Sequence, residues 1–333
     1  MADKHILVTG DRPTGRLHLG HLAGSLENRL KFQDQYACFF LVADLHMLTT
    51  HFDKTGEVEK STLEMVTDWL SVGMNPEKSV FYIQSQISAI SRLNVILSML
   101  CSVPRCGRIP TLKEKIQDLG VGEAYSVGLL GYPVLMASDI LVFKATKVPV
   151  GEDQLSHIEL TRELARRFNS LYGEMFEEPE PVISRVSRLV GLDGDRKMSK
   201  SLNNCIYLSD TEKEVNKKVG GMFTDPKRVR ADIPGTVEGN PVFEYHDAFN
   251  PDVEEIEDLK DRYRKGAVGD VEVKQKLAKA INAVLEPFRE KRAEFEKRPD
   301  DVRDILRHGT AKANESANEH IEEIIKKTGL FNP

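Results

Sequence analysis

PTGRLHLGH, at residues 13–21, follows a short apolar run and a turn rich in glycine and proline. From Leu17 onward the apolar residues recur at near-helical spacing, which predicts a helix. A strand, a glycine-bearing turn and a helix N-terminus form an anion site, because free backbone N–H groups and the helix dipole face the ligand. His18 and His21 share one helix face, so both can contact one phosphate group, and Gly20 leaves room for a nucleotide.

A second motif, KMSKS at residues 197–201, lies in a Gly/Asp-rich region. Lys197 and Lys200 can supply mobile positive charge to a departing pyrophosphate, which stabilises a transition state electrostatically. We therefore interpret His18, His21, Lys197 and Lys200 as catalytic residues. Each motif alone also fits a solvated helix start or a surface loop. Together, in this order, they resemble the paired ATP-binding signatures (HIGH and KMSKS) of class I aminoacyl-tRNA synthetases.

Strand-like and helical patterns alternate in the first half of the chain. The strand candidates are short apolar runs at residues 5–8, 37–43 and 79–83. Helical patterns lie between them, as at residues 18–32 and 57–72. Alternation of this kind predicts an α/β fold with a Rossmann-like parallel sheet. Ligands bind at the carboxyl ends of such strands, where we expect loops at residues 9–14 and 44–50.

After KMSKS the strand signals almost vanish and charged helical segments dominate. We predict three parts: a Rossmann-like catalytic domain at 1–201, a mainly helical domain at 202–295, and C-terminal helices at 296–333 that pack back on the first domain. The resemblance makes the middle part the tRNA anticodon-binding domain. The apolar stretch at residues 128–144 is interrupted by Pro133, and it predicts a buried helix after that proline.

Composition sets limits on function. The chain has 333 residues, of which 40% are hydrophobic and 29% charged, as in ordinary globular proteins. The net charge of −6 excludes a generally basic nucleic-acid surface, so RNA contacts need local patches. One candidate patch, equally typical of a solvated helix face, consists of Lys213, Lys217, Lys218, Lys227, Arg228 and Arg230. The four cysteines show no metal-ligand spacing, so no protein metal site is predicted. Without a leader or a long apolar run, we expect a cytoplasmic protein with no membrane partner.

Longer motifs narrow the resemblance to bacterial tryptophanyl-tRNA synthetases. GYPVLMASDIL at residues 131–141, VPVGEDQLSHIELTREL at 148–164 and VADLHMLTTHFD from Val42 are similar to that family. The resemblance implies two steps: L-tryptophan attacks the α-phosphate of ATP to give tryptophanyl-AMP, and the 3′ end of tRNA(Trp) then takes the amino acid. It also implies Mg²⁺ with the nucleotide and a homodimer.

Asp139 is the residue on which the choice of amino acid rests. In tryptophan-specific members the matching aspartate accepts a hydrogen bond from the indole N–H, which can only donate. A helix carboxylate paired with an Arg or Lys is the alternative. Further substrate-binding residues implied by the resemblance are Tyr132, Met136, His46, Val148, Val150 and Gln154, although Met136, Val148 and Val150 also fit ordinary core packing. The resemblance implies ATP contacts at Arg12, Pro13, Thr14, Gly20, His21, Gly151, Glu152, Asp153, Leu189, Lys197, Met198, Ser199, Lys200 and Ser201.

The chain departs from the family pattern at several positions. Arg12 stands where many members carry Gln, and Thr111 replaces a residue that is often Gln and faces the substrate. Lys115, in contrast, matches a lysine that holds the phosphates in the family, although it also fits a solvated helix lysine. Some members bind an iron–sulfur cluster through cysteines of the second domain. This chain has no cysteine after Cys205, so no cluster is predicted. Two other functions stay open: a tyrosine-specific synthetase of the same class, or a catalytically weak tRNA-binding regulatory paralogue.

Overall fold

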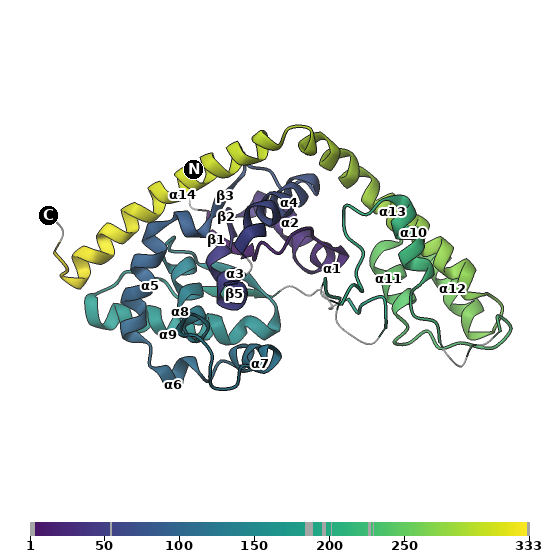
Figure 1. Cartoon of the computed structure of the whole chain (residues 1–333), viewed down its shortest axis with the longest axis horizontal. Coiled ribbons are helices and arrows are strands. Elements are labelled where there is room, and N and C mark those ends of the chain that lie inside the picture. The colour runs from purple at the N-terminus through teal and green to yellow at the C-terminus, as the bar shows by residue number, and fades with distance from the viewer. Residues whose placement is uncertain are drawn as a thin grey trace.

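The structure is a computed structural model that describes residues 4–53, 55–183, 189–194, 198–200, 202–225, 228 and 230–331. A parallel five-stranded sheet with the strand order β3-β2-β1-β4-β5 forms its centre (Figure 1). The strands are β1 Ile6–Asp11, β2 Ala37–Val42, β3 Ser79–Ile83, β4 Lys147–Val150 and β5 Glu180–Ile183. The strand order reverses between β1 and β4, and ligands bind at such a switch point in open α/β sheets. The predicted α/β fold with a parallel sheet is confirmed.

The elements that were not predicted include two strands and the helix that follows β2. β4 is only four residues long, and β5 is equally short, contains Pro181 and lies at the sheet edge, where proline is tolerated. The prediction of a loop at residues 44–50 was wrong, because the helix α3 Asp44–His51 follows β2 directly. Its first N–H groups, those of Leu45 and His46, donate to Gln84 Oε1 at 3.1 and 3.3 Å. A residue from the end of β3 therefore caps this helix, and no local signal in the sequence reveals that contact.

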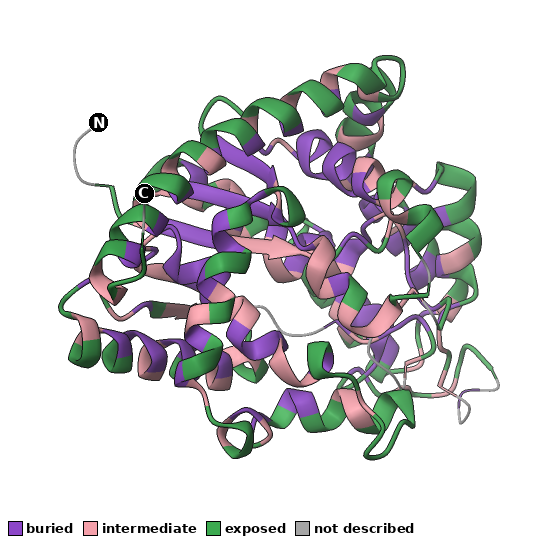
Figure 2. Ribbon diagram, turned by 60° about the vertical axis from the view of Figure 1, so that its left-hand side comes forward, coloured by how far each residue is buried: buried purple, intermediate pink, exposed green. Residues whose placement is uncertain are grey.

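Helices cover both faces of the sheet. Those of the first half are α1 Leu19–His21, α2 Glu27–Gln35, α3, α4 Val58–Ser71, α5 Ser88–Leu100, α6 Val103–Cys106, α7 Pro110–Leu119, α8 Val127–Leu141 and α9 Leu155–Tyr172. Successive strand residues point to opposite faces, so Phe40 and Phe81 belong to one apolar cluster and Phe39 and Tyr82 to the other. Figure 2 shows the buried strands between helices whose outer faces are exposed.

The helix predicted after Pro133 begins earlier. Ser126 Oγ accepts the Leu129 N–H at 3.0 Å and caps α8, so Pro133 lies inside the helix. Nowhere in the described ranges is there a helix with both the length and the apolar character needed to cross a membrane.

Beyond β5 the described residues form helices joined by turns and irregular segments, and Tyr207 makes an isolated bridge with His18. The helices are α10 Glu212–Gly220, α11 Pro241–Phe249, α12 Val253–Arg264, α13 Asp270–Glu296 and α14 Pro299–Thr328. In Figure 1, α13 and α14 form an arch that joins the helical part to the sheet. α13 packs on α10, α11 and α4, and α14 packs along β3 and α5.

Gly309 allows α14 to approach β3 closely. A Cβ at this position would lie 2.0 Å from the carbonyl oxygen of Phe81. One residue later, Thr310 Oγ1 accepts the Ile83 N–H at 3.2 Å. α14 therefore covers the edge strand of the sheet, whose backbone groups would otherwise be open to pairing with another chain.

Candidate active site

The HLGH residues lie where the chain leaves β1 and enters α1. The His18 N–H donates to Nδ1 of His21 at 3.2 Å, and the two ring centroids are 3.9 Å apart. Since Nδ1 of His21 accepts, the proton of the neutral ring is on Nε2, which is then available as a donor. Burial lowers the pKa of His21 to about 4, so this imidazole is neutral at pH 7.

Lys200 of the KMSKS motif contacts the turn after β1. Its Nζ donates to Thr14 O and Thr14 Oγ1 at 3.1 Å and to Gly15 O at 3.0 Å. The structure thus brings Lys200 to the same turn that leads into HLGH. Burial lowers the pKa of Lys200, while nearby carboxylates oppose that shift. Lys197 and Ser201 lie outside the described residues.

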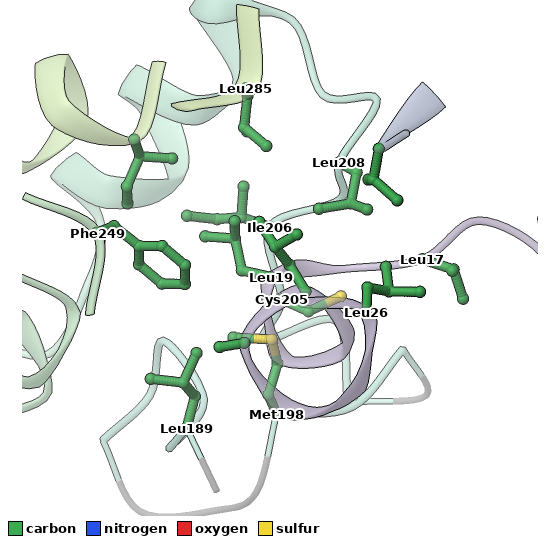
Figure 3. Close-up of a cluster of buried hydrophobic side chains, with 14 of the residues drawn as sticks. Leu17, Leu19, Leu26, Leu189, Met198, Cys205, Ile206, Leu208, Phe249 and Leu285 are labelled. Atoms are coloured by element: carbon green, nitrogen blue, oxygen red, sulfur yellow. The ribbon is translucent and has the colours of Figure 1, made fainter. Parts of the chain in front are cut away.

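The remainder of the described KMSKS loop is anchored in the core. The Gly20 N–H faces Met198 Sδ at 3.3 Å, and a Cβ on Gly20 would lie 3.2 Å from that sulfur. Gly20 therefore makes room for the loop itself. The side chains of Met198 and Leu189 are buried in the same apolar cluster as Leu19 (Figure 3). The Ser199 N–H donates to Oδ1 of Asn204 at 2.8 Å, which fixes the loop conformation.

Asp139 lies at the centre of a second group of side chains. α8 places Tyr132, Met136 and Asp139 four and three residues apart, on one helix face. Asp139 is buried, and its Oδ2 lies 2.8 Å from His46 Nε2. Gln84 Nε2 donates to both carboxylate oxygens at 2.7 and 2.9 Å. The partners of Asp139 are thus a histidine and an amide, not the Arg or Lys of the alternative interpretation.

The charge state of Asp139 reflects two opposing effects. Burial raises the pKa of Asp139, and the hydrogen bonds from His46 and Gln84 oppose that rise. A carboxylate offers about four acceptor positions, so these two partners leave capacity for a further donor. Gln84 was not predicted as a site residue. The available signal was its position directly after an apolar strand, at the sheet edge where ligands bind.

Tyr132, on the same face of α8 as Asp139, belongs to a buried polar network. Its hydroxyl lies 2.9 Å from both Thr111 Oγ1 and His157 Nε2, and Lys115 Nζ is 3.9 Å from its ring centroid. Burial and the charge of Arg12 lower the pKa of Lys115 to about 8. Thr111 is buried and bonded within this network. His157, whose pKa burial lowers to about 4, was not predicted.

The remaining predicted residues divide between the sheet edge and the core. The exposed residues directly after β4 are Gly151, Glu152 and Asp153, and Gln154 Nε2 donates to Asp153 Oδ2 at 3.0 Å. Arg12 is exposed on the turn after β1 and donates to Thr50 Oγ1 at 3.2 Å, whereas Pro13 is buried. Val148 and Val150 are buried in the apolar cluster on one face of the sheet, as ordinary core packing would have them.

A further buried network beside His21 was missed. Asp11 accepts two hydrogen bonds from Arg29, at 2.6 and 3.0 Å, and one from Trp69 Nε1 at 3.2 Å. Burial alone would raise the pKa of Asp11, but the charge and hydrogen bonds of Arg29 hold it below its usual value. An aspartate closing an apolar strand was the available signal, although its partners could not be read from spacing.

The basic residues proposed to contact RNA do not form one exposed patch in the structure. The side chain of Arg228 is fully buried and bonded to Asp270 at 3.0 Å, so it cannot contact RNA, and that interpretation was wrong for this residue. Lys218 donates to the buried Asp210 at 2.5 Å. Lys227 lies outside the described residues.

Comparison with known proteins identifies the family. Residues 2–286 match the model described as tRNA synthetases class I (W and Y). This chain belongs to that family. The tryptophan--tRNA ligase of Treponema pallidum (strain Nichols) is 51% identical to it, over 97% of this chain and 96% of the relative. The same ligase of Thermotoga maritima is 45% identical over 98% of this chain and 99% of its own length.

Solved synthetase structures share the architecture. The tryptophanyl-tRNA synthetase from Campylobacter jejuni, complexed with ADP and tryptophan, has a TM-score of 0.86 and 33% identity, covering 98% of this chain and 100% of its own. A tyrosyl-tRNA synthetase from Archaeoglobus fulgidus, complexed with L-tyrosine, has a TM-score of 0.67 at 22% identity, covering 87% and 90%. The tyrosine enzyme therefore shares the synthetase fold only, whereas the relatives of high identity are tryptophan enzymes.

Proposed function

We propose that this chain is a tryptophan--tRNA ligase, which activates L-tryptophan with ATP to tryptophanyl-AMP and transfers it to the 3′ end of tRNA(Trp). The observation that carries this proposal is the 51% identity to a ligase of that name over nearly the whole of both chains. The buried acceptor Asp139 supports it, because an indole N–H is a donor only and requires such a partner. The proposed activity places the protein in the cytoplasm, where tRNA is charged.

The adenylation step takes place, in this proposal, between the HLGH and KMSKS residues. The tryptophan carboxylate attacks the α-phosphate while His18 and His21 hold the phosphate oxygens by hydrogen bonds. A neutral His21 serves as a donor through Nε2 and contributes orientation more than charge. Positive charge comes from Lys197 and Lys200. In the described conformation Lys200 is satisfied by neutral oxygens of Thr14 and Gly15, which a negatively charged pyrophosphate can replace.

The nucleotide contacts lie at the carboxyl ends of β1 and β4. We assign the adenosine to the exposed residues after β4, beginning with Gly151, and the phosphates to the turn that contains Arg12 and Thr14. The charge of Arg12 lowers the pKa of Lys115, so the two cations are close enough to interact and together favour a bound anion. In the part of the chain that the structure describes, no group of three or more His, Cys, Asp or Glu side chains could hold a metal. We propose that Mg²⁺ binds together with the ATP phosphates, as this ion commonly does in phosphate-transfer sites.

The larger organisation follows from the same assignment. We retain the boundaries at residues 201 and 295 as a proposal, with the helices from α10 to α13 meeting the tRNA.

We also propose a homodimer. Large exposed apolar side chains on the adjoining helices α5, α6 and α8 support this interface: Val95, Met99, Val103 and Val127. Sedimentation of Met99→Asp tests it, since a monomer is expected, and an unchanged dimer would place the interface elsewhere.

Amino-acid-dependent ATP–pyrophosphate exchange tests the ligase assignment. Exchange with tryptophan and negligible exchange with tyrosine is the expected result. Exchange with tyrosine alone would make the chain a tyrosine enzyme and remove Asp139 from its role. No exchange with either amino acid, from a folded protein, would favour the regulatory tRNA-binding paralogue.

A further inference from the structure

Asp68 is a buried carboxylate outside both signature motifs, yet it contacts the main chain directly in front of His18. It lies on α4 and is 1% exposed. Its Oδ2 accepts the Leu17 N–H at 2.6 Å, and its Oδ1 pairs with the guanidinium of Arg292. One carboxylate thus joins three segments: α4, the chain entering HLGH, and the end of α13.

The segment around Leu17 is held from two sides. Opposite Asp68, Leu17 O accepts the Leu208 N–H at 2.9 Å, and the Leu19 N–H donates to Ile206 O at 3.0 Å. Figure 3 shows Leu17, Leu19, Ile206 and Leu208 within one apolar cluster. Residues 206–208 follow the KMSKS loop closely. A displacement at Asp68 therefore reaches the main chain that positions both signature motifs.

Arg292 connects this point to the helical part of the chain. It lies near the end of α13, where Nη1 is also 3.4 Å from Glu64 O and Nε donates to Glu296 at 2.9 Å. The rest of α13 packs on α10 and α11. At 27 residues the helix spans about 40 Å, and although Pro287 lies inside it, the chain runs as one helix from the helical part to the pair with Asp68.

A contribution to folding stability does not by itself explain the ion pair between Asp68 and Arg292. Burial raises the pKa of Asp68 to about 6, even though Arg292 and the Leu17 N–H lower it and Glu64 on the same helix raises it only slightly. The charge of Lys200, in the KMSKS loop, also faces Asp68. A buried ion pair can often be replaced by apolar side chains with no loss of stability, because the cost of desolvation offsets the attraction. What an apolar pair cannot supply is a directed acceptor for Leu17 N–H.

We propose that Asp68 is a positioning residue for the adenylation step: paired with Arg292, it fixes the main chain at Leu17, so that the placement of His18 and His21 follows the position of α13. The inference rests on the proposed ligase function, and it adds a mechanical link between the helical part and the phosphate-binding residues.

The double variant Asp68→Leu/Arg292→Met separates positioning from stability. We expect it to fold with a somewhat lower melting temperature, because the buried Leu17 N–H loses its acceptor, while kcat of tryptophan-dependent exchange falls about 10-fold or more and KM for tryptophan changes little. Arg292→Lys, which keeps the charge, should retain most of the rate. Glu59→Gln is the matched control, because it removes an exposed pair between α4 and Arg303 of α14. A folded double variant with the original kcat would overturn the proposal.

Amide hydrogen exchange gives a readout that does not depend on activity. Arg292→Met should speed exchange in residues 16–22, although Arg292 itself bonds to α4 and to its own helix. Unchanged exchange there would overturn the coupling, even if the double variant failed to fold. Failure of the original chain to exchange pyrophosphate with tryptophan would instead contradict the ligase assignment, and the amide measurement would still decide whether α13 controls the HLGH segment.

Discussion

Replacing Asp139 with asparagine tests the indole acceptor more cleanly than replacing it with alanine. Alanine would leave the donors of His46 and Gln84 unpaired in a buried site, at a cost of about 1–3 kcal/mol each. Asparagine keeps the volume and one acceptor oxygen but removes the charge. Hydrogen bonds to charged groups contribute about 1.5–3 kcal/mol against about 1 kcal/mol for neutral ones. The expected loss for tryptophan is therefore about 1–2 kcal/mol, or roughly 10-fold in kcat/KM.

Phenylalanine provides the internal reference, because it has no N–H to lose. Its kcat/KM should stay unchanged in Asp139→Asn, so discrimination between the two amino acids falls about 10-fold, and by about 100-fold or more in Asp139→Ala. Pyrophosphate exchange at varied concentrations of each amino acid measures this ratio. Asp44→Asn is a suitable control, since Asp44 is a nearby carboxylate that contacts Leu45 and Ser85 instead. An equal loss for tryptophan and phenylalanine would refute the acceptor role.

Three further results are expected. Lys200→Ala should lower kcat for exchange about 10²- to 10³-fold and change KM for tryptophan far less, and equal effects on both would remove Lys200 from its role. Because burial raises the pKa of Asp68 from 3.8 to about 6, the folded chain binds a proton on acidification before the unfolded chain does. The free energy of unfolding in urea should therefore rise by about 1 kcal/mol more in the unaltered chain than in Asp68→Asn when the pH falls from 7.5 to 5. The same pH dependence in both proteins would contradict the raised pKa of Asp68. Gly309→Ala should destabilise the fold by about 1–3 kcal/mol, whereas Gly131→Ala, with open space in α8, should not; equal stability of the two would show that α14 can move away from β3.

The central architecture was readable because it depends on local patterns. The apolar runs that became β1, β2 and β3 are bounded by turns, and helical periodicity separates them. These strands depend only on neighbouring residues, and they were predicted. The shared helix face of His18 and His21 was not found: His18 caps α1 in an extended conformation, and it meets His21 through the bond from its N–H to Nδ1 of His21.

The misses share a different cause. Gln84 caps α3 and bonds to Asp139 across 55 positions of sequence, and Asp68 meets Arg292 across 224. Neither pairing leaves a periodic signal, because the partners come from separate elements that only the packed fold brings together. Arg228 illustrates the converse: its charge suggested an RNA contact, but its buried carbonyl partners could not be foreseen.

Charging of tRNA tests the central claim most directly. The purified chain would be incubated with ATP, labelled tryptophan and a tRNA(Trp) transcript, with tyrosine and a tRNA(Tyr) transcript in parallel. The account predicts that label accumulates on the 3′ end of tRNA(Trp) with tryptophan alone. Charging of tRNA(Tyr) with tyrosine, or no charging of either tRNA by a folded protein, would contradict it.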